Sequence, residues 1–150
     1  MPKITPFLWF DTQAEEAMNF YATIFEDSKV VSVNRAQGRV MTVEFELEGQ
    51  RFMGLNAGPV YQFNEAVSFF VAVETQREID ELWAKLTAGG GTPGRCGWLK
   101  DQFGLSWQIV PRTLGSLMSG PDPAASKRVV DALMQMTKLD VARLQQAYDG

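Results

Sequence analysis

The sequence contains no histidine and only one cysteine among its 150 residues. Histidine is the commonest general base and transition-metal ligand, so its absence excludes Ser-His-Asp and Cys-His catalysis, zinc-hydrolase motifs and the two-histidine iron site. Any metal would have to be held mainly by carboxylate and carbonyl oxygens, which favours magnesium or calcium over zinc, iron or nickel. Cys96 cannot form an internal disulfide and has no partner base, so we interpret it as a small apolar filler in a protein from a reducing compartment.

Long apolar runs and an excess of positive charge are also missing. The longest apolar stretches, such as residues 66–73, have the length of a strand, so the sequence predicts no membrane span, and the N-terminus does not resemble a signal peptide. The formal net charge is -4 and the lysines and arginines are scattered, which leaves no basic surface for nucleic acid. With 45% hydrophobic residues the chain can bury a core. We predict a cytoplasmic globular protein that binds neither nucleic acid nor a membrane.

One short pattern occurs twice, a threonine followed three residues later by glutamate, and its spacing is that of a helix-starting capping box. The two copies are Thr12 with Glu15 and Thr75 with Glu78, which lie 75 − 12 = 63 residues apart. Each predicted helix follows an apolar strand, at residues 5–10 and 68–73. Apolar residues then recur with helical spacing, at Ala17, Phe20, Tyr21 and Ile24 and again at Ile79, Leu82, Trp83 and Leu86.

Further strands are predicted after each helix. Residues 28–36, 40–48 and 51–58 follow the first helix, and the second of these alternates apolar and polar residues, as a half-buried strand does. The glycine run at residues 89–91 ends the second helix, and residues 95–101 and 103–111 supply later strands. Asp122 and Asp140 then cap two C-terminal helices, whose apolar sides need a sheet or another subunit to cover them.

A strand, a helix and three strands, used twice, resembles the paired βαβββ modules of the vicinal oxygen chelate superfamily, which includes glyoxalase I, extradiol dioxygenases and bleomycin-resistance proteins. Within it the chain resembles the PhnB-like branch, also labelled 3-demethylubiquinone-9 3-methyltransferase. The matching segments are "ITPFLWFDTQAEEAMNFYATIFEDSKV", "RFMGLNAGP", "DQFGLSWQIVP" and "MQMTKLDVARLQQAYDG". The resemblance implies an α+β fold with a curved mixed-sheet cup: a single domain over residues 1–150, with modules at about 1–60 and 64–112 and a helical tail at about 113–150.

The resemblance also places four candidate metal-ligand positions. Metal enzymes of the superfamily carry one ligand on the first and one on the last strand of each module. The first-strand positions fall at Thr5 and Ser68, and the last-strand positions at Gln108 and Met53. Two hydroxyls, an amide and a thioether supply no negative charge for a divalent cation. The resemblance therefore implies a cup that has lost its metal, and we predict no metal and no cofactor.

Residues two apart on a strand share a face, so Thr5 lies with Phe7 and Trp9, and Ser68 lies with Phe70. Faces that mix aromatic and polar side chains suit a small-molecule pocket. Alternatively, the polar residues only bond neighbouring strands or water. The predicted ligand-binding residues are Thr5, Phe7, Trp9, Met53, Ser68, Phe70, Trp98 and Gln108.

Three function classes stay open. The first is a metal-independent protein that binds a small, partly aromatic or amphipathic ligand. The second is an enzyme without a transition metal, with Glu44 or Asp101 as base, although Glu44 lies on a regularly alternating strand that favours a solvated carboxylate. The third is the methyltransferase of the branch label, although neither predicted helix is entered through a Gly-rich turn. We expect a homodimer, because members of the superfamily commonly pair modules across a subunit interface.

Overall fold

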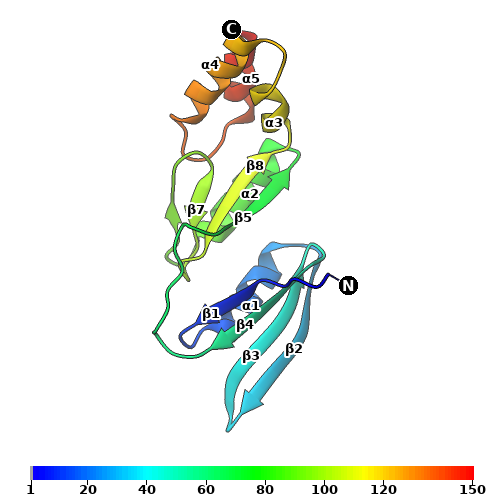
Figure 1. The fold of residues 1–150 in the computed structure, drawn as a ribbon, viewed down its shortest axis with the longest axis vertical. Helices are drawn as coiled ribbons and strands as arrows, with labels where there is room; N and C mark the ends of the chain where they lie inside the picture. The colour runs from blue at the N-terminus through cyan, green and yellow to red at the C-terminus, as the bar shows by residue number, and fades with distance from the viewer. Residues whose placement is uncertain (1) are drawn as a thin grey trace. The chain divides into compact units, whose positions relative to one another are not determined.

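The computed structural model describes residues 2–150. The chain divides into two compact units, Met1–Phe63 (unit 1) and Asn64–Gly150 (unit 2). Each unit contains a four-stranded mixed sheet built in the order strand, helix, three strands, and unit 2 ends in three further helices (Figure 1). The predicted α+β fold class is therefore confirmed. The single-domain boundaries stay a prediction.

Unit 1 contains β1 (Phe7–Phe10), α1 (Ala14–Ile24), β2 (Ser28–Ala36), β3 (Arg39–Leu47) and β4 (Gln50–Asn56). The sheet order is β1-β4-β3-β2, with β1 parallel to β4 and the other pairs antiparallel. β1 is shorter than the predicted strand at residues 5–10. Pro6 has no N–H to donate to a neighbouring strand, although its carbonyl still accepts the N–H of Met53 at 2.9 Å.

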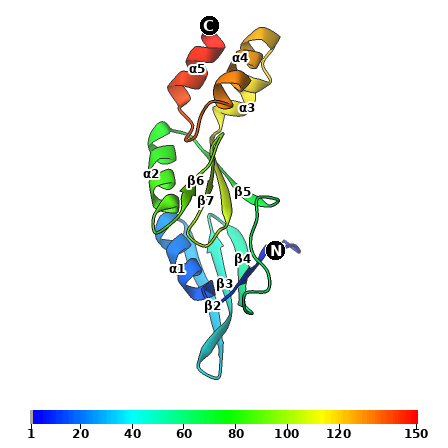
Figure 2. The same ribbon diagram turned by 90° about the vertical axis from the view of Figure 1, so that its left-hand side faces the viewer.

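Helix α1 covers one face of the unit 1 sheet (Figure 2). Beneath it Phe45 stacks on Phe52, with ring centroids 5.3 Å apart, and on Tyr21 of the helix. A Cβ atom at Gly54 would lie 2.9 Å from Cγ2 of Val43 on the neighbouring strand β3, so glycine leaves room for the Val43 side chain. The opposite face has no covering helix within unit 1, and we call it the open face of unit 1.

Unit 2 contains β5 (Ser68–Val73), α2 (Gln76–Thr87), β6 (Thr92–Pro93), β7 (Trp98–Lys100) and β8 (Ser106–Pro111). The sheet order is β5-β8-β7-β6, with β5 parallel to β8. The two-residue strand β6 was not predicted, since it is too short for an alternating pattern. Helix α2 covers one face (Figure 2), and the other face is the open face of unit 2. The side chains buried on the helix side include Ile79, Trp83, Leu86, Leu99, Trp107 and Ile109.

Only one of the two predicted threonine caps forms, and there the Glu78 carboxylate accepts the N–H of Glu74, one residue before the cap. Thr75 caps α2, and its side chain accepts the N–H of Glu78 at 3.2 Å. The first prediction was wrong: the N-cap of α1 is Gln13, which makes no side-chain cap. Instead Asn56, at the end of β4, accepts the N–H of Ala14 at 2.8 Å. A cap supplied across 42 residues leaves no local sequence signal.

The C-terminal tail contains α3 (Thr113–Met118), α4 (Pro123–Leu133) and α5 (Val141–Asp149). Asp122 and Asp140 cap α4 and α5 as predicted, whereas α3 was not predicted. The helices bury their apolar sides against one another and against the end of β8. We call this the tail cluster, and its buried members are Val110, Leu114, Val129, Met136, Leu139 and Leu144.

The tail also holds the loop that precedes β7. The backbone N–H groups of Cys96 and Gly97 donate to the carbonyls of Met136 and Thr137, each at 2.8 Å. The tail thus covers most of its own apolar side, although Val130 and Met134 stay exposed. Within residues 2–150, no helix combines the length and apolarity that a bilayer crossing requires.

Candidate ligand-binding faces

The strand register of unit 2 places three predicted site residues in one row. Gln108 on β8 is the partner of Phe70 on β5 and of Trp98 on β7. Partners across a sheet share a face, and Trp107 and Ile109 on either side of Gln108 point toward α2. Phe70, Gln108 and Trp98 therefore lie together on the open face of unit 2. Phe70 is 61% exposed, which is unusual for a phenylalanine in a strand.

Ser68 belongs to the same face, two residues before Phe70. The side-chain Nε2 of Gln108 donates to Oγ of Ser68 at 2.9 Å, so two predicted site residues contact each other. The interaction matches the alternative that polar residues bond neighbouring strands. It also leaves Oε1 of Gln108 able to accept and the hydroxyl of Ser68 able to donate.

The open face of unit 1 contains the other predicted residues. Phe7 of β1 is the partner of Met53 on β4, and Met53 is the partner of Glu44 on β3. The pair Phe7 and Met53 therefore corresponds in register to the pair Phe70 and Gln108 in unit 2. Phe7 is 53% exposed, close to the value for Phe70.

Trp9 lies on the same open face, two residues after Phe7, whereas Thr5 lies outside the strand. The indole N–H of Trp9 donates to the carbonyl of Gly58 at 2.9 Å, and its ring meets the ring of Tyr61 edge-on at 4.9 Å. Thr5 is half-buried and lies before β1 begins. The structure thus groups Phe7, Trp9 and Met53 in unit 1, and Ser68, Phe70, Trp98 and Gln108 in unit 2. Whether both groups contact one ligand stays a prediction.

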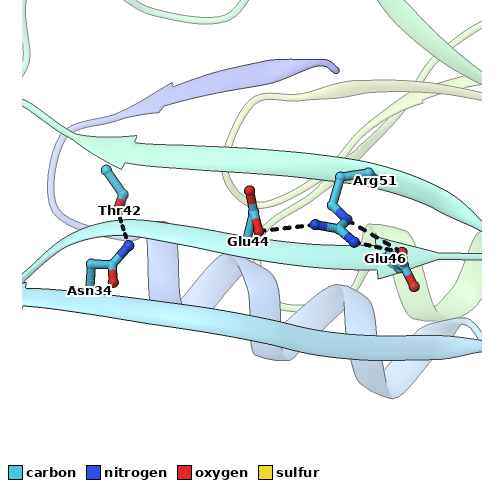
Figure 3. Close-up of polar contacts among 5 residues, drawn as sticks. All are labelled: Asn34, Thr42, Glu44, Glu46 and Arg51. Atoms are coloured by element: carbon cyan, nitrogen blue, oxygen red, sulfur yellow. Dashed lines mark hydrogen bonds and ion pairs between the residues drawn. The ribbon is translucent and has the colours of Figure 1, made fainter. Parts of the chain in front are cut away.

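Charged side chains that the sequence analysis did not single out occupy the open face of unit 1. Arg51 of β4 lies between two glutamates of β3, with Nη1 3.0 Å from Oε2 of Glu44 and Nη2 3.1 Å from Oε1 of Glu46 (Figure 3). All three side chains are half-buried. The available signal was the short β3–β4 turn, which places Arg51 opposite Glu46. Glu44 is therefore an ion-paired carboxylate and not a freely solvated one.

Asp101, the other carboxylate considered as a base, is 3% exposed and lies between β7 and β8. Its Oδ1 accepts the backbone N–H groups of Phe103 and Leu105 at 2.9 and 3.0 Å. Its Oδ2 accepts the indole N–H of Trp107 at 2.9 Å. These contacts tie the carboxylate to the hairpin and favour a structural role for Asp101.

The four positions carried over from metal enzymes of the superfamily do not fit a divalent cation. Gln108 and Ser68 are hydrogen-bonded to each other, Met53 offers a thioether, and none of the four carries a negative charge. Across residues 2–150, histidine, cysteine, aspartate and glutamate side chains form no group of three or more that could hold a metal ion.

Solved structures define the class of protein. A glyoxalase-related enzyme from Fulvimarina pelagi superposes with a TM-score of 0.53 at 14% identity, covering 75% of this chain and 91% of that one. A glyoxalase/bleomycin resistance protein from Albidiferax ferrireducens gives a TM-score of 0.52 at 14% identity, covering 74% and 99%. At these identities the likeness shows the fold alone, which is the glyoxalase fold.

The family follows from closer matches. The model of the 3-demethylubiquinone-9 3-methyltransferase family matches residues 2–110. A PhnB protein from Bacillus cereus, with a proposed 3-demethylubiquinone-9 3-methyltransferase activity, is 36% identical, with a TM-score of 0.69 over 73% of this chain and 99% of that one. The chain belongs to this family, the PhnB-like branch of the vicinal oxygen chelate superfamily. No curated protein matches it. The family match ends before the C-terminal tail, although the tail segment "MQMTKLDVARLQQAYDG" contributed to the predicted resemblance.

Proposed function

We propose that this protein binds a small, partly aromatic or amphipathic molecule through the open faces of its sheets, without a metal ion. The observation that carries the proposal is the row of Phe70, Gln108 and Trp98 on unit 2. Binding sites for small molecules combine aromatic walls with a few polar groups that orient the ligand. An exposed phenylalanine beside an amide with a free acceptor oxygen has this character.

Binding can be tested with 1-anilinonaphthalene-8-sulfonate, an amphipathic aromatic probe, by fluorescence titration. We expect Phe70→Ser to weaken binding roughly tenfold or more, because a buried aromatic contact contributes about 1.5–3 kcal/mol. Met134→Ser is the matched control, since Met134 is also exposed but lies in the tail. Equal loss in both variants, or no loss in either, would contradict the proposal.

Metal independence is supported by the uncharged donor set at Thr5, Met53, Ser68 and Gln108. Elemental analysis of the protein after dialysis against a chelator measures it directly. We expect less than stoichiometric zinc, iron, nickel and manganese. A transition metal retained at one equivalent would contradict the proposal.

A methyltransferase is the second candidate, favoured by the description of the matched family. The structure offers no support for a Rossmann-type S-adenosylmethionine site. The connections from β1 to α1 and from β5 to α2 are residues 11–13 and 74–75, and neither contains glycine. Isothermal titration with S-adenosylmethionine separates the candidates, because tight stoichiometric heat would place the methyltransferase first.

An enzyme acting without a transition metal is the third candidate. Glu44 supports it, because this half-buried carboxylate is oriented by Arg51 and lies in the same row as Met53 and Phe7. A general base must be held in position near its substrate. Loss of turnover in Glu44→Gln, with ligand affinity retained, would support a catalytic role once a reaction is known.

We also propose a homodimer in the cytoplasm. Exposed apolar residues outside the proposed ligand contacts support the dimer, and they include Ile4, Val60 and Val67. The cytoplasmic location is supported by the single cysteine. Sedimentation equilibrium tests the dimer, and a monomer at concentrations of about 100 μM would contradict it.

A further inference from the structure

We propose that the open face of unit 2 selects ligands that carry an anionic oxygen beside a planar ring, with the oxygen bound by Lys100 and Ser106. This inference rests on the proposed function and names the class of ligand. It follows from how polarity changes along strands β5, β8 and β7.

A polar row adjoins the aromatic row described above. Ser106 of β8 is the partner of Ser68 on β5 and of Lys100 on β7, and Lys100 is the partner of Thr92 on β6. Ser68 precedes Phe70 by two positions, Ser106 precedes Gln108 by two, and Lys100 follows Trp98 by two. Thr92 lies opposite Lys100. The row of Ser68, Ser106, Lys100 and Thr92 therefore shares the open face with the row of Phe70, Gln108 and Trp98.

The opposite end of this face is apolar and closed. Ala72 is the partner of Val110, and both lie two residues beyond the aromatic row. Val110 belongs to the tail cluster, so the helices cover the sheet at this end. The face thus changes from polar, through aromatic, to apolar along the strands. A ligand with one ring and one polar end can satisfy it in a single orientation.

Ser106 is the strongest sign of a missing polar partner. It is 1% exposed, and its Oγ has no hydrogen-bond partner among the described residues. A buried hydroxyl without a partner costs free energy, and such groups are rare in native proteins. Once the side chains that now bury Ser106 have moved aside, a ligand oxygen that accepts from this hydroxyl would remove the cost.

Lys100 shows which charge the polar end of the face accepts. Its Nζ is paired with the carboxylate of Glu65, and both side chains are exposed. The hydrogen bond and the charge of Lys100 lower the pKa of Glu65 below its ordinary value. A carboxylate therefore already fits beside Lys100. We infer that Glu65 holds the position that a ligand anion takes when it binds.

The planar part of the ligand then lies over Gln108. Phe70 and Trp98 stand on the strands to either side of β8, about 10 Å apart along the row, a spacing into which one planar ring fits. Oε1 of Gln108 remains available to a ligand donor on the ring. The ligand class is an aromatic carboxylic acid, whose carboxylate is attached to the ring.

Two probes of the same shape test the inference: naphthalene-2-carboxylate, which is anionic, and naphthalene-2-carboxamide, which is neutral. Their affinities are measured by isothermal titration at pH 7. We expect the carboxylate to bind roughly tenfold more tightly or better, because hydrogen bonds to a charged group are the stronger ones. Ser106→Ala and Lys100→Gln should each reduce the preference, and Lys100→Gln should abolish it.

Glu65→Gln provides the sharpest variant, because it is expected to improve binding. It frees Lys100 and should raise the affinity for the carboxylate severalfold while leaving the carboxamide unchanged. Glu81→Gln is the matched control: it makes the same change in net charge on α2, where Glu81 pairs with Arg77. Both positions are exposed, so both variants should fold, which far-UV circular dichroism checks.

The possible outcomes separate the inference from the proposed function. If both probes bind wild type equally, the inference is overturned and the proposed function stands. If the carboxylate is preferred but Lys100→Gln and Glu65→Gln leave the preference unchanged, Lys100 is not the anion partner and the inference is again overturned. If neither probe binds, the inference and the aromatic ligand of the proposed function both fall.

Discussion

Replacing Asp101 tests whether its buried carboxylate holds together the β7–β8 hairpin, which carries Lys100 and Ser106. Asp101→Ala removes the acceptor of two buried hydrogen bonds, from the N–H of Leu105 and the indole N–H of Trp107. Hydrogen bonds to a charged group contribute about 1.5–3 kcal/mol each, so we expect a loss of about 3–6 kcal/mol. Urea unfolding followed by circular dichroism measures it.

Asparagine at this position separates the two oxygens. Asp101→Asn keeps an oxygen for the amides of Phe103 and Leu105 but turns an NH₂ group toward the indole N–H of Trp107. We expect a loss of about 1.5–3 kcal/mol in wild type. In a Trp107→Phe background the donor conflict is gone, and the loss should be at least about 1 kcal/mol smaller.

A control variant and a minimum expected loss of stability complete the test of Asp101. Asp131→Ala removes an exposed carboxylate that pairs with Lys127 on α4, and it should change stability by less than about 0.5 kcal/mol. A cost below about 1 kcal/mol for Asp101→Ala would refute the structural role assigned to this carboxylate. It would also return Asp101 to the candidates for a catalytic base.

Three further predictions concern the helices and the tail. Asn56→Ala should destabilise the protein by about 1–2 kcal/mol in thermal unfolding, because Asn56 caps α1. Thr12→Ala should have almost no effect, and equal losses in the two variants would indicate that Thr12 caps the helix after all. Gly97→Ala should lower the free energy of unfolding by about 1–3 kcal/mol, since Gly97 has φ +85° and a Cβ there would lie 3.0 Å from Cγ of Leu139. Gly115→Ala, within α3, is the control and should be neutral or stabilising. A larger loss in Gly115→Ala than in Gly97→Ala would contradict the contact between Gly97 and the tail. Hydrogen bonds from Lys138 and Gln76 lower the pKa of Asp80, so the stability that Asp80 contributes is complete above its unfolded-state pKa and is lost as pH falls through its folded-state pKa. Asp80→Asn should therefore flatten the decline in the free energy of unfolding below about pH 4. An unchanged slope would show that the ion pair of Asp80 with Lys138 does not hold the tail.

The repeated unit could be predicted from sequence because its signals are local. Alternation in β3 and the helical spacing after Thr75 depend on residues a few positions apart, and both elements form as predicted. The two copies of the unit differ by one residue between strand and helix. The N-caps Gln13 and Thr75 lie 75 − 13 = 62 residues apart, whereas the strand positions Phe7 and Phe70 lie 70 − 7 = 63 apart. The connection between strand and helix is one residue shorter in unit 2.

The cap of α1 and the contacts of the tail had no such signal. Asn56 at the end of β4 caps α1 at Ala14, and the carbonyls of Met136 and Thr137 accept from the loop before Trp98. Short elements such as β6 and α3 depend on their neighbours, since two to six residues carry too little pattern to specify a structure alone.

The sequence by itself determined the absence of histidine chemistry, the strand-helix repeat and the uncharged side chains at the four carried-over positions, because these depend on residue identity and local periodicity. Tertiary structure alone decided which polar groups find partners. Register sets Gln108 beside Ser68, Arg51 between two glutamates, and the hydroxyl of Ser106 without a partner among the described residues. Such pairings join residues that are close only after the strands align, so the sequence could name the candidates but not their contacts.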